Sequence, residues 1–138
     1  MTYKSAFVDS DVLLDLLFKH EPFFTFSQTL LTKSKNKVIT ISTSALIIAN
    51  IHYIISKNIG KEIAKESIRA LIDKMNILPF EVDAISLAIN SEFTDFEDAI
   101  QHYIAQKHQC DVIISRNLKH YKRSHLPVLT AEQFLNTL

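Results

Sequence analysis

Short apolar runs alternate with stretches of helical periodicity along this chain, and the alternation constrains the fold more than any other feature. Runs typical of strands occupy residues 5–8, 38–41, 77–80, 112–115 and 127–129. Helical spacing fills the intervals, at residues 12–18, 22–35, 45–57, 61–75, 82–89 and 94–108, and resumes after residue 130. Strands separated by helices pair in parallel. We therefore predict a single three-layer α/β domain over residues 1–138, with a mainly parallel sheet of four or five strands.

Hydroxyl and carboxyl residues mark the expected helix starts. Ser42 and Ser44 are good N-caps for the helix that begins at Ala45. Residues 94–97 (Thr-Asp-Phe-Glu) and 130–133 (Thr-Ala-Glu-Gln) each match a capping box, which predicts a helix start at both places.

Charge is balanced overall but unevenly distributed. Fifteen basic and fifteen acidic residues give a formal net charge of zero, so total charge predicts no polyanionic partner. Residues 75–106 contain acids but no Lys or Arg, whereas residues 107–125 are basic apart from Asp111. An acidic segment followed by a basic one can bind a metal ion and a phosphate chain together, or the two segments can form two solvated faces.

The rarest residues exclude several classes of protein. Gly60 is the only glycine, which rules out glycine-rich nucleotide loops, and Cys110 is the only cysteine, which rules out disulfides and cysteine zinc clusters. The first residues lack the order of a signal peptide, and no apolar run is long enough to span a membrane. We expect a cytoplasmic protein.

Polar residues follow the apolar runs at three places. Asp9 ends the first run, Ser115 to Asn117 end the fourth, and Asp95 and Asp98 open the helix before it. In a parallel sheet, ligands bind at the carboxyl ends of the strands, so these segments should converge at one edge. Oxygen ligands without cysteine or paired histidine suit Mg²⁺ or Mn²⁺.

Three blocks of the sequence resemble a known family, the PIN domain, which is the metal-dependent nuclease fold of VapC-type toxins. Residues 6–15 resemble its first strand, which ends in an aspartate. Residues 95–101 with 111–117 resemble its acidic helix start and the following strand end. Residues 127–135 resemble its closing strand and helix.

The resemblance implies an RNA-cleaving enzyme that uses Mg²⁺ or Mn²⁺. On this basis Asp9 and Asp98 would bind the metal, and Asp95 would be an alternate ligand or would orient the ligands. The catalytic set implied by the resemblance is Asp9, Asp98, Asp95 and Asn117. The implied substrate-binding set is Ser115, Arg116, Lys119 and Asn50. For Ser115, Arg116, Asn117 and Lys119, a purely structural role is an equal alternative. Asp11 is expected to cap a helix and not to bind metal.

The sequence departs from the family at two acidic positions. Asn50 stands where a glutamate is expected, and Asn117 or His120 stands at the places of a fourth acid. A second interpretation is therefore a PIN domain that no longer cuts and binds RNA, an antitoxin or another protein. Histidines could compensate or could be structural: His52, His102 and His120.

A third interpretation, ranked lower, is a haloacid-dehalogenase-type phosphatase. Its first motif would be Asp9-Ser10-Asp11, with Asp9 as the nucleophile. Two expected features are missing: Leu13 stands where Thr or Val is expected, and no glycine follows Asp11.

The family resemblance also implies partners. A VapC-like protein is expected to form a homodimer and to bind a small antitoxin protein, with no membrane contact. The apolar stretches 12–17 and 45–55 could be contact surfaces or core.

Overall fold

Five parallel strands form the centre of the molecule. The computed structural model describes residues 3–138; Met1 and Thr2, which belong to the segment examined for a signal peptide, lie outside that range. The strand order is β3-β2-β1-β4-β5, and every neighbouring pair is parallel. The strands are β1 (Ser5–Val8), β2 (Thr40–Ser44), β3 (Asn76–Leu78), β4 (Val112–Ile114) and β5 (Val128–Leu129). The predicted fold class is confirmed.

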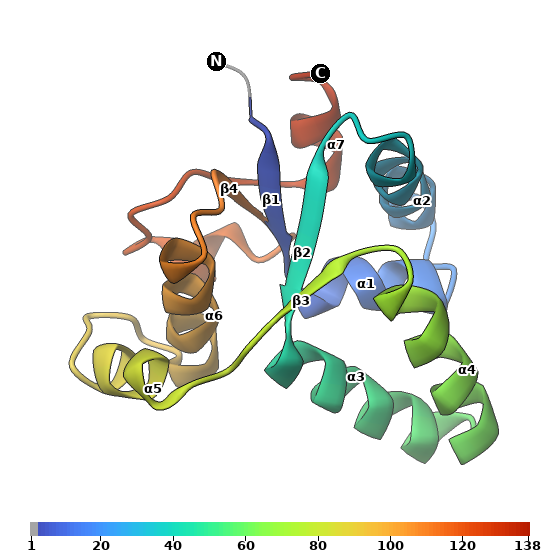
Figure 1. Cartoon of the computed structure of the whole chain (residues 1–138), viewed down its shortest axis with the longest axis horizontal. Helices are drawn as coiled ribbons and strands as arrows, with labels where there is room; N and C mark the ends of the chain where they lie inside the picture. The colour runs from blue at the N-terminus through green and yellow to red at the C-terminus, as the bar shows by residue number, and fades with distance from the viewer. Residues whose placement is uncertain (1–2) are drawn as a thin grey trace.

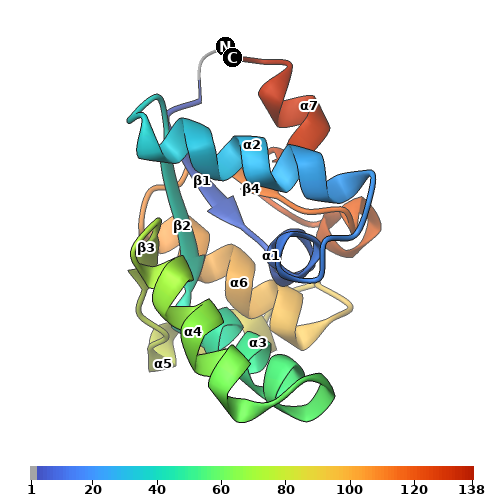
Figure 2. The same ribbon diagram turned by 90° about the vertical axis from the view of Figure 1, so that its right-hand side faces the viewer.

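Helices cover both faces of the sheet. They are α1 (Ser10–Leu17), α2 (Phe23–Lys35), α3 (Ala45–Asn58), α4 (Lys61–Ile72), α5 (Val82–Ile89), α6 (Phe96–Lys107), the 3-10 helix η1 (Leu118–Tyr121) and α7 (Ala131–Leu135). Figure 1 shows α5 and α6 on one side of the sheet and α1, α2 and α4 on the other. In Figure 2, α3 and α4 run next to each other below α2, which crosses the sheet.

The core is built on the two central strands. Ala6, Phe7 and Val8 of β1 are fully buried, and so is the whole of β4. Central strands of a parallel sheet are covered on both faces, which explains their continuous apolar runs. The edge strands β3 and β5 are short and only partly buried.

Two strands begin and end elsewhere than the sequence pattern predicts. The second strand was expected at residues 38–41, but β2 starts at Thr40 because Lys37 turns the chain with a positive φ of 61°. Its polar residues can be buried because Thr43 Oγ1 donates to Val8 O at 2.9 Å and Ser44 Oγ donates to Gln101 Oε1 at 2.6 Å. The third strand was expected at residues 77–80. It ends at Leu78 because Pro79 has no N–H for the sheet.

Two predicted helix starts are confirmed and two are shifted. Ser44 caps α3, and Thr130 forms the predicted capping box of α7. The predicted box at Thr94 is wrong, because the Asp95 carboxylate caps α6 instead. The cap of α1 is Asp9 and not Asp11, since the Asp9 side chain accepts from the N–H of Ser10.

The apolar faces of α1 and α3 belong mainly to the core. Val12 and Leu13 of α1, and the Ile47, Ile51 and Ile55 row of α3, are at most 2% exposed. Helix α5 exposes four large apolar residues (Val82, Ile85, Leu87 and Ile89), and is therefore a better candidate contact surface than stretches 12–17 and 45–55. Within residues 3–138, no helix has the length and hydropathy needed to cross a bilayer.

Candidate active site

Four aspartates gather where β1, β4 and α6 meet, and we call Asp9, Asp11, Asp95 and Asp98 the acid cluster. The backbone N–H of Asp9 donates to Ile114 O at 2.9 Å, which joins the ends of β1 and β4. Asp98 stands in the first turn of α6, close enough to Asp9 for the two charges to interact. Parallel strand pairing therefore brings together acids that lie almost ninety residues apart.

Asp9 is held in place by three hydrogen bonds. Its Oδ1 accepts from the backbone N–H of Ser10 at 2.8 Å, and its Oδ2 accepts from Ser115 Oγ and from the hydroxyl of Tyr121, each at 3.0 Å. Burial raises the pKa of Asp9, while the three hydrogen bonds act to lower it. The carboxylate is thus fixed in orientation but is short of positive charge.

Asp98 faces the segment that follows β4. Nδ1 of His120 lies 2.9 Å from its Oδ2, an ion-pair distance without the alignment of a hydrogen bond. Burial, followed by the negative charges of Asp9 and Asp95, raises the pKa of Asp98 to about 7. Near neutral pH a nearby cation would therefore stabilise the ionised form of this carboxylate.

Asp11 belongs to the same cluster, although the sequence suggested only a helix cap. Its Oδ2 accepts from the backbone N–H of Arg116 at 2.8 Å and from Ser115 Oγ at 3.4 Å. Its Oδ1 is buried and has no hydrogen-bond partner among residues 3–138. Burial and the charge of Asp9 raise the pKa of Asp11 to about 6.

Asp95 is the exposed member of the acid cluster, and two further predicted site residues, Asn117 and Lys119, lie at its rim. Asp95 is exposed, and its Oδ1 accepts from the N–H of Asp98 at 2.9 Å, which fixes the start of α6. Asn117 donates its backbone N–H to Ser115 Oγ at 3.0 Å, and its side chain is exposed. Lys119 is exposed on η1.

The guanidinium of Arg116 is engaged within the protein. Its Nε donates to Asp15 Oδ2 at 2.7 Å and its Nη2 to Asp15 Oδ1 at 2.9 Å. Its Cζ lies 4.2 Å from the ring centroid of Phe23, and Asp15 is buried. Arg116 therefore ties the end of β4 to α1 and α2, a contact that competes with the predicted binding of phosphate.

Asn50 and two of the three histidines lie apart from the acids. Asn50 is half-buried on α3 and makes no hydrogen bond to the acid cluster among residues 3–138. His52 is exposed on the same helix. His102 is fully buried, its Nε2 accepts from the N–H of His125 at 3.0 Å, and burial lowers its pKa to about 4. Only His120 contacts the cluster.

Sequence reasoning missed two residues of the site. Tyr121 was not singled out, because nothing in residues 115–121 shows that η1 turns its hydroxyl toward Asp9. Asp15 was missed too, although its spacing of four from Asp11 places both acids on one face of α1.

The cluster has the chemistry of a cation site, with few protein ligands. Within residues 3–138, no group of three or more His, Cys, Asp or Glu side chains is arranged to hold a metal ion. Two carboxylates are nevertheless enough for Mg²⁺, which keeps several water ligands. The partnerless Oδ1 of Asp11 and the mutual repulsion of Asp9 and Asp98 fit a bound cation.

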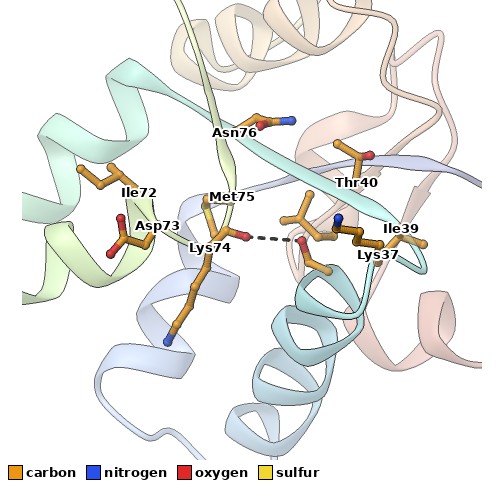
Figure 3. A pocket seen from close by; sticks show the side chains of 10 residues that line it. Lys37, Ile39, Thr40, Ile72, Asp73, Lys74, Met75 and Asn76 are labelled. Atoms are coloured by element: carbon orange, nitrogen blue, oxygen red, sulfur yellow. Dashed lines mark hydrogen bonds between the residues drawn. The ribbon is translucent and has the colours of Figure 1, made fainter.

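A hollow lies at the opposite edge of the sheet. It has a volume of about 530 Å³ and is lined by the starts of β2 and β3 and the end of α4, as Figure 3 shows. Ser34 Oγ donates to Lys74 O across it at 3.3 Å. Asp73 is its only carboxylate and none of the predicted site residues lines it, so the acid cluster remains the candidate site.

Comparison of sequences identifies relatives over most of the chain. The PIN domain profile matches residues 5–119. Ribonuclease VapC1 from Aquifex aeolicus (strain VF5) is 30% identical over 140 residues, which cover 97% of this chain and 95% of that protein.

Solved structures share the fold at lower identity. VapBC2 from Rickettsia felis, bound to a DNA fragment from its promoter, has a TM-score of 0.69 at 17% identity and covers 90% of this chain and 96% of its own. A toxin–antitoxin complex from Klebsiella pneumoniae has a TM-score of 0.67 at 21% identity, covering 92% and 98%. Mycobacterium tuberculosis VapC20, described as a sarcin–ricin loop cleaving toxin, has a TM-score of 0.63 at 14% identity, covering 79% and 87%. The PIN domain profile matches residues 5–119, and ribonuclease VapC1 is 30% identical over 97% of the chain. This chain therefore belongs to the PIN-domain family.

Proposed function

We propose that this protein is a divalent-metal-dependent ribonuclease that acts as the toxin of a toxin–antitoxin pair. The observation that carries the proposal is the position of two acids: Asp9 directly follows β1, and Asp98 stands in the first turn of α6, where burial and the charge of Asp9 raise its pKa. The 30% identity to ribonuclease VapC1 supports the same activity. Membership in the PIN family weighs against the phosphatase interpretation.

Asp9 and Asp98 would hold the metal, Mg²⁺ or Mn²⁺. The bound ion would supply a water of lowered pKa and neutralise charge on the leaving oxygen of the RNA phosphodiester. Its charge would offset the repulsion that raises the pKa of Asp98, so both carboxylates would be ionised at neutral pH.

The other residues of the site orient these two acids or contact the substrate. Ser115 and Tyr121 hold the Asp9 carboxylate in one orientation. Asp95 fixes the first turn of α6 and with it the position of Asp98. Asn117 and Lys119 are exposed at the rim and would contact an RNA phosphate.

A second candidate is a PIN domain that binds RNA without cutting it. Two observations favour it: Asn50 makes no hydrogen bond to the acids among the described residues, and His120 stands beside Asp98 where a carboxylate could be. Loss of negative charge weakens binding of a hard divalent cation.

Cleavage assays distinguish the two candidates. Purified protein is incubated with structured and unstructured RNA in Mg²⁺ or Mn²⁺, beside the variants Asp9→Asn and Asp73→Asn. Asp73 is an exposed acid of the opposite edge and serves as the matched control. We expect cleavage by the wild type and the control, and a loss of at least ~100-fold in Asp9→Asn. Equal cleavage by wild type and Asp9→Asn, or none by either, would remove the nuclease proposal.

An antitoxin is the proposed protein partner. Structural neighbours from Rickettsia felis and Klebsiella pneumoniae are complexes of this kind, which supports the proposal. Co-expression with the product of the adjacent reading frame should yield a complex that does not cleave RNA. Separate elution of the two proteins, with cleavage unchanged, would contradict it.

We also propose a homodimer that forms through α5. Val82, Ile85 and Ile89 are 75%, 40% and 68% exposed and are spaced i, i+3 and i+7, so they form one apolar row. The charges beside the row are already paired, since Lys107 Nζ lies 2.9 Å from Glu81 and 2.7 Å from Asp83. Two copies can therefore meet on this face without burying an unpaired charge.

A further inference from the structure

A basic hollow lies between α3 and α4, outside the acid cluster. Its volume is about 510 Å³, and we call its lining the α3–α4 patch: His52, Tyr53, Ser56, Lys57, Lys61 and Lys65. The two helices pack side by side, as Figures 1 and 2 both show. Among the described residues, 3–138, no acidic side chain lines the hollow.

The three lysines of the patch carry nearly uncompensated charge. Lys65 lies 3.9 Å from Glu62, but both side chains are more than half exposed, so this pair contributes little. Among residues 3–138, neither Lys57 nor Lys61 takes part in an ion pair. Lys61 and Lys65 stand one turn apart on α4, opposite Lys57 at the end of α3. The patch can therefore bind an anion with at least two ammonium groups.

An exposed aromatic ring stands among these lysines. Tyr53 is 58% exposed, and the Nζ of Lys57 lies 6.0 Å from its ring centroid. Proteins that bind single-stranded nucleic acid combine a positively charged groove with aromatic rings on which bases stack. The carboxylates of an acidic peptide do not stack on a ring as every nucleic-acid base does, so the ring favours nucleic acid.

Beside the patch, the first N–H groups of α4 and the hydroxyl of Ser56 have no hydrogen-bond partner among residues 3–138. The N-cap of α4 is Gly60, which offers no side chain to the N–H groups of the first turn. The hydroxyl of Ser56 is buried and has no hydrogen-bond partner in the part of the chain that the structure describes. Free N–H groups at a helix start bind phosphate readily, and a hydroxyl beside them can donate a further hydrogen bond.

An exposed row along α3 runs from the patch toward the carboxyl end of β2. Ala45, Ala49, Tyr53 and Lys57 follow one another at intervals of four and are all exposed. The row starts beside Ser44, whose hydroxyl bonds Gln101, one turn beyond Asp98 on α6. Tyr53 lies about 14 Å further along the helix axis, at 1.5 Å per residue. A short single strand can therefore reach from the patch to the end of β2.

We propose that the α3–α4 patch binds the phosphate backbone of single-stranded RNA away from the cut bond, with a base stacked on Tyr53. The proposal rests on the proposed ribonuclease function for the identity of the ligand. The lysines bind the phosphates, the first turn of α4 and Ser56 add hydrogen bonds, and the alanines of α3 leave room for the strand.

The test measures RNA binding without cleavage. A fluorescently labelled single-stranded oligonucleotide is titrated in EDTA at several salt concentrations, with anisotropy as the readout. The patch variant carries Lys57→Gln, Lys61→Gln and Lys65→Gln. The control carries Lys33→Gln, Lys35→Gln and Lys74→Gln, which remove the same charge from another surface. Circular dichroism confirms that both fold.

We expect at least about tenfold weaker binding in the patch variant than in the control at low salt. The slope of log K against log salt should fall by about 2, because each phosphate contact contributes about 0.7. Tyr53→Ala should weaken binding at least about fivefold through lost stacking.

Each outcome decides the matter. Binding within twofold of the control in both variants overturns the proposal, and so does a wild type that binds no RNA. The same titration with labelled polyglutamate is the comparison: a patch variant that loses binding to polyglutamate but binds RNA unchanged overturns the proposal in favour of an acidic protein. If the wild type never cuts RNA but the patch variants bind it less, the patch is supported and the ribonuclease function fails. If the wild type cuts RNA but the patch variants bind RNA as tightly as the control does, the ribonuclease function is supported and the patch proposal fails.

Discussion

Tyr121 places a neutral hydroxyl against the most buried acid of the site. Burial and the charge of Asp9 raise the pKa of Tyr121 well above its usual value, so the phenol keeps its proton wherever the enzyme works. Its hydrogen bond to Asp9 favours the ionised carboxylate, which burial disfavours. The hydroxyl thus partly offsets the effect of burial on the pKa of Asp9 without adding a charge of its own.

Removal of this hydroxyl should be visible in the pH dependence of cleavage. In Tyr121→Phe the ionised Asp9 loses a donor, so its pKa rises and the acid limb of the rate profile moves to higher pH. We expect about tenfold slower cleavage at pH 6, since a hydrogen bond to a charged group is worth about 1.5 kcal/mol, and a smaller loss at pH 9. Tyr103→Phe is the control, as no hydrogen bond of its hydroxyl occurs among residues 3–138. An equal loss at both pH values would contradict a role through Asp9.

Two variants distinguish whether Asp95 caps helix α6 or binds the metal. Asparagine also caps helices, so Asp95→Asn should leave the free energy of unfolding within about 0.5 kcal/mol of wild type, whereas Asp95→Ala should lower it by about 1 kcal/mol. The charge of Asp95 raises the pKa of Asp98, so the Asn variant should cut RNA at lower pH than wild type. Urea unfolding and rate profiles provide the measurements. If Asp95→Asn cuts at no pH, Asp95 binds the metal.

Residue identities could be predicted where a strand end fixes their position, and not where a side chain's direction matters. Asp9 and Ser115 were expected at one edge because each follows a strand, and their side chains meet there. Tyr121 depends on how η1 turns after β4, and the pairing of Arg116 with Asp15 depends on a rotamer. Neither leaves a periodic signal in the sequence.

At the scale of elements, the Arg116–Asp15 pair joins β4 to α1. The carboxylate is 1% exposed and accepts two hydrogen bonds from the guanidinium, which also stacks on Phe23 of α2. Because Asp9 and Asp11 stand at the start of α1, this contact also fixes the acids relative to the end of β4. It therefore connects packing of the helices with geometry of the site.

Breaking the pair should destabilise the protein more than removing a similar surface charge. Arg116→Met leaves Asp15 buried without its main partner, which should lower the free energy of unfolding by about 3 kcal/mol. Lys119→Met, an exposed cation three residues away, should change it by less than about 0.5 kcal/mol. Urea denaturation at pH 7 measures both. Equal values for the two variants would show that the pair is not structural.

Elements were predicted best where burial and pattern agree. The central strands β1 and β4 are covered on both faces, and their apolar runs revealed them nearly to the residue. Strand β2 carries Ser42, Thr43 and Ser44 in buried positions. Its sequence gives no strand signal there, because hydroxyl residues can be buried only when tertiary partners satisfy them, and those partners lie on other elements.

At the scale of the whole molecule, the acid cluster lowers the stability of the folded state at neutral pH. The pKa of Asp98 is about 7 and that of Asp11 about 6 in the folded protein, against about 3.9 when unfolded. Between these values the folded state binds more protons, so these two groups stabilise it fully below pH 4 and lose that contribution as pH rises to 7. A bound cation would restore it.

This pH dependence of stability predicts how the metal-free protein behaves. In EDTA, Asp98→Asn should be more stable than wild type at pH 8 by about 1–2 kcal/mol, a value reduced for solvent screening, and the difference should vanish near pH 4. Added Mn²⁺ should stabilise wild type at pH 8 but not the variant. Urea unfolding across this pH range is the measurement. A variant less stable than wild type at pH 8 would show that the acids do not repel.

Assembly of two copies is the largest-scale prediction, and it depends on the apolar row of α5. A stable interface buries about 800 Å² on each partner, so the row must be joined by neighbouring apolar residues such as Phe96, which is 45% exposed. Val82→Lys with Ile89→Lys places two charges in that interface, and both sites are largely exposed in one copy, so the fold should persist. Light scattering during gel filtration should give a dimer for wild type and a monomer for the variant at micromolar concentration. Val38→Lys with Ile72→Lys changes two exposed apolar residues elsewhere and should stay dimeric. A wild-type monomer, or a dimer that survives the α5 substitutions, would show that this face serves another contact.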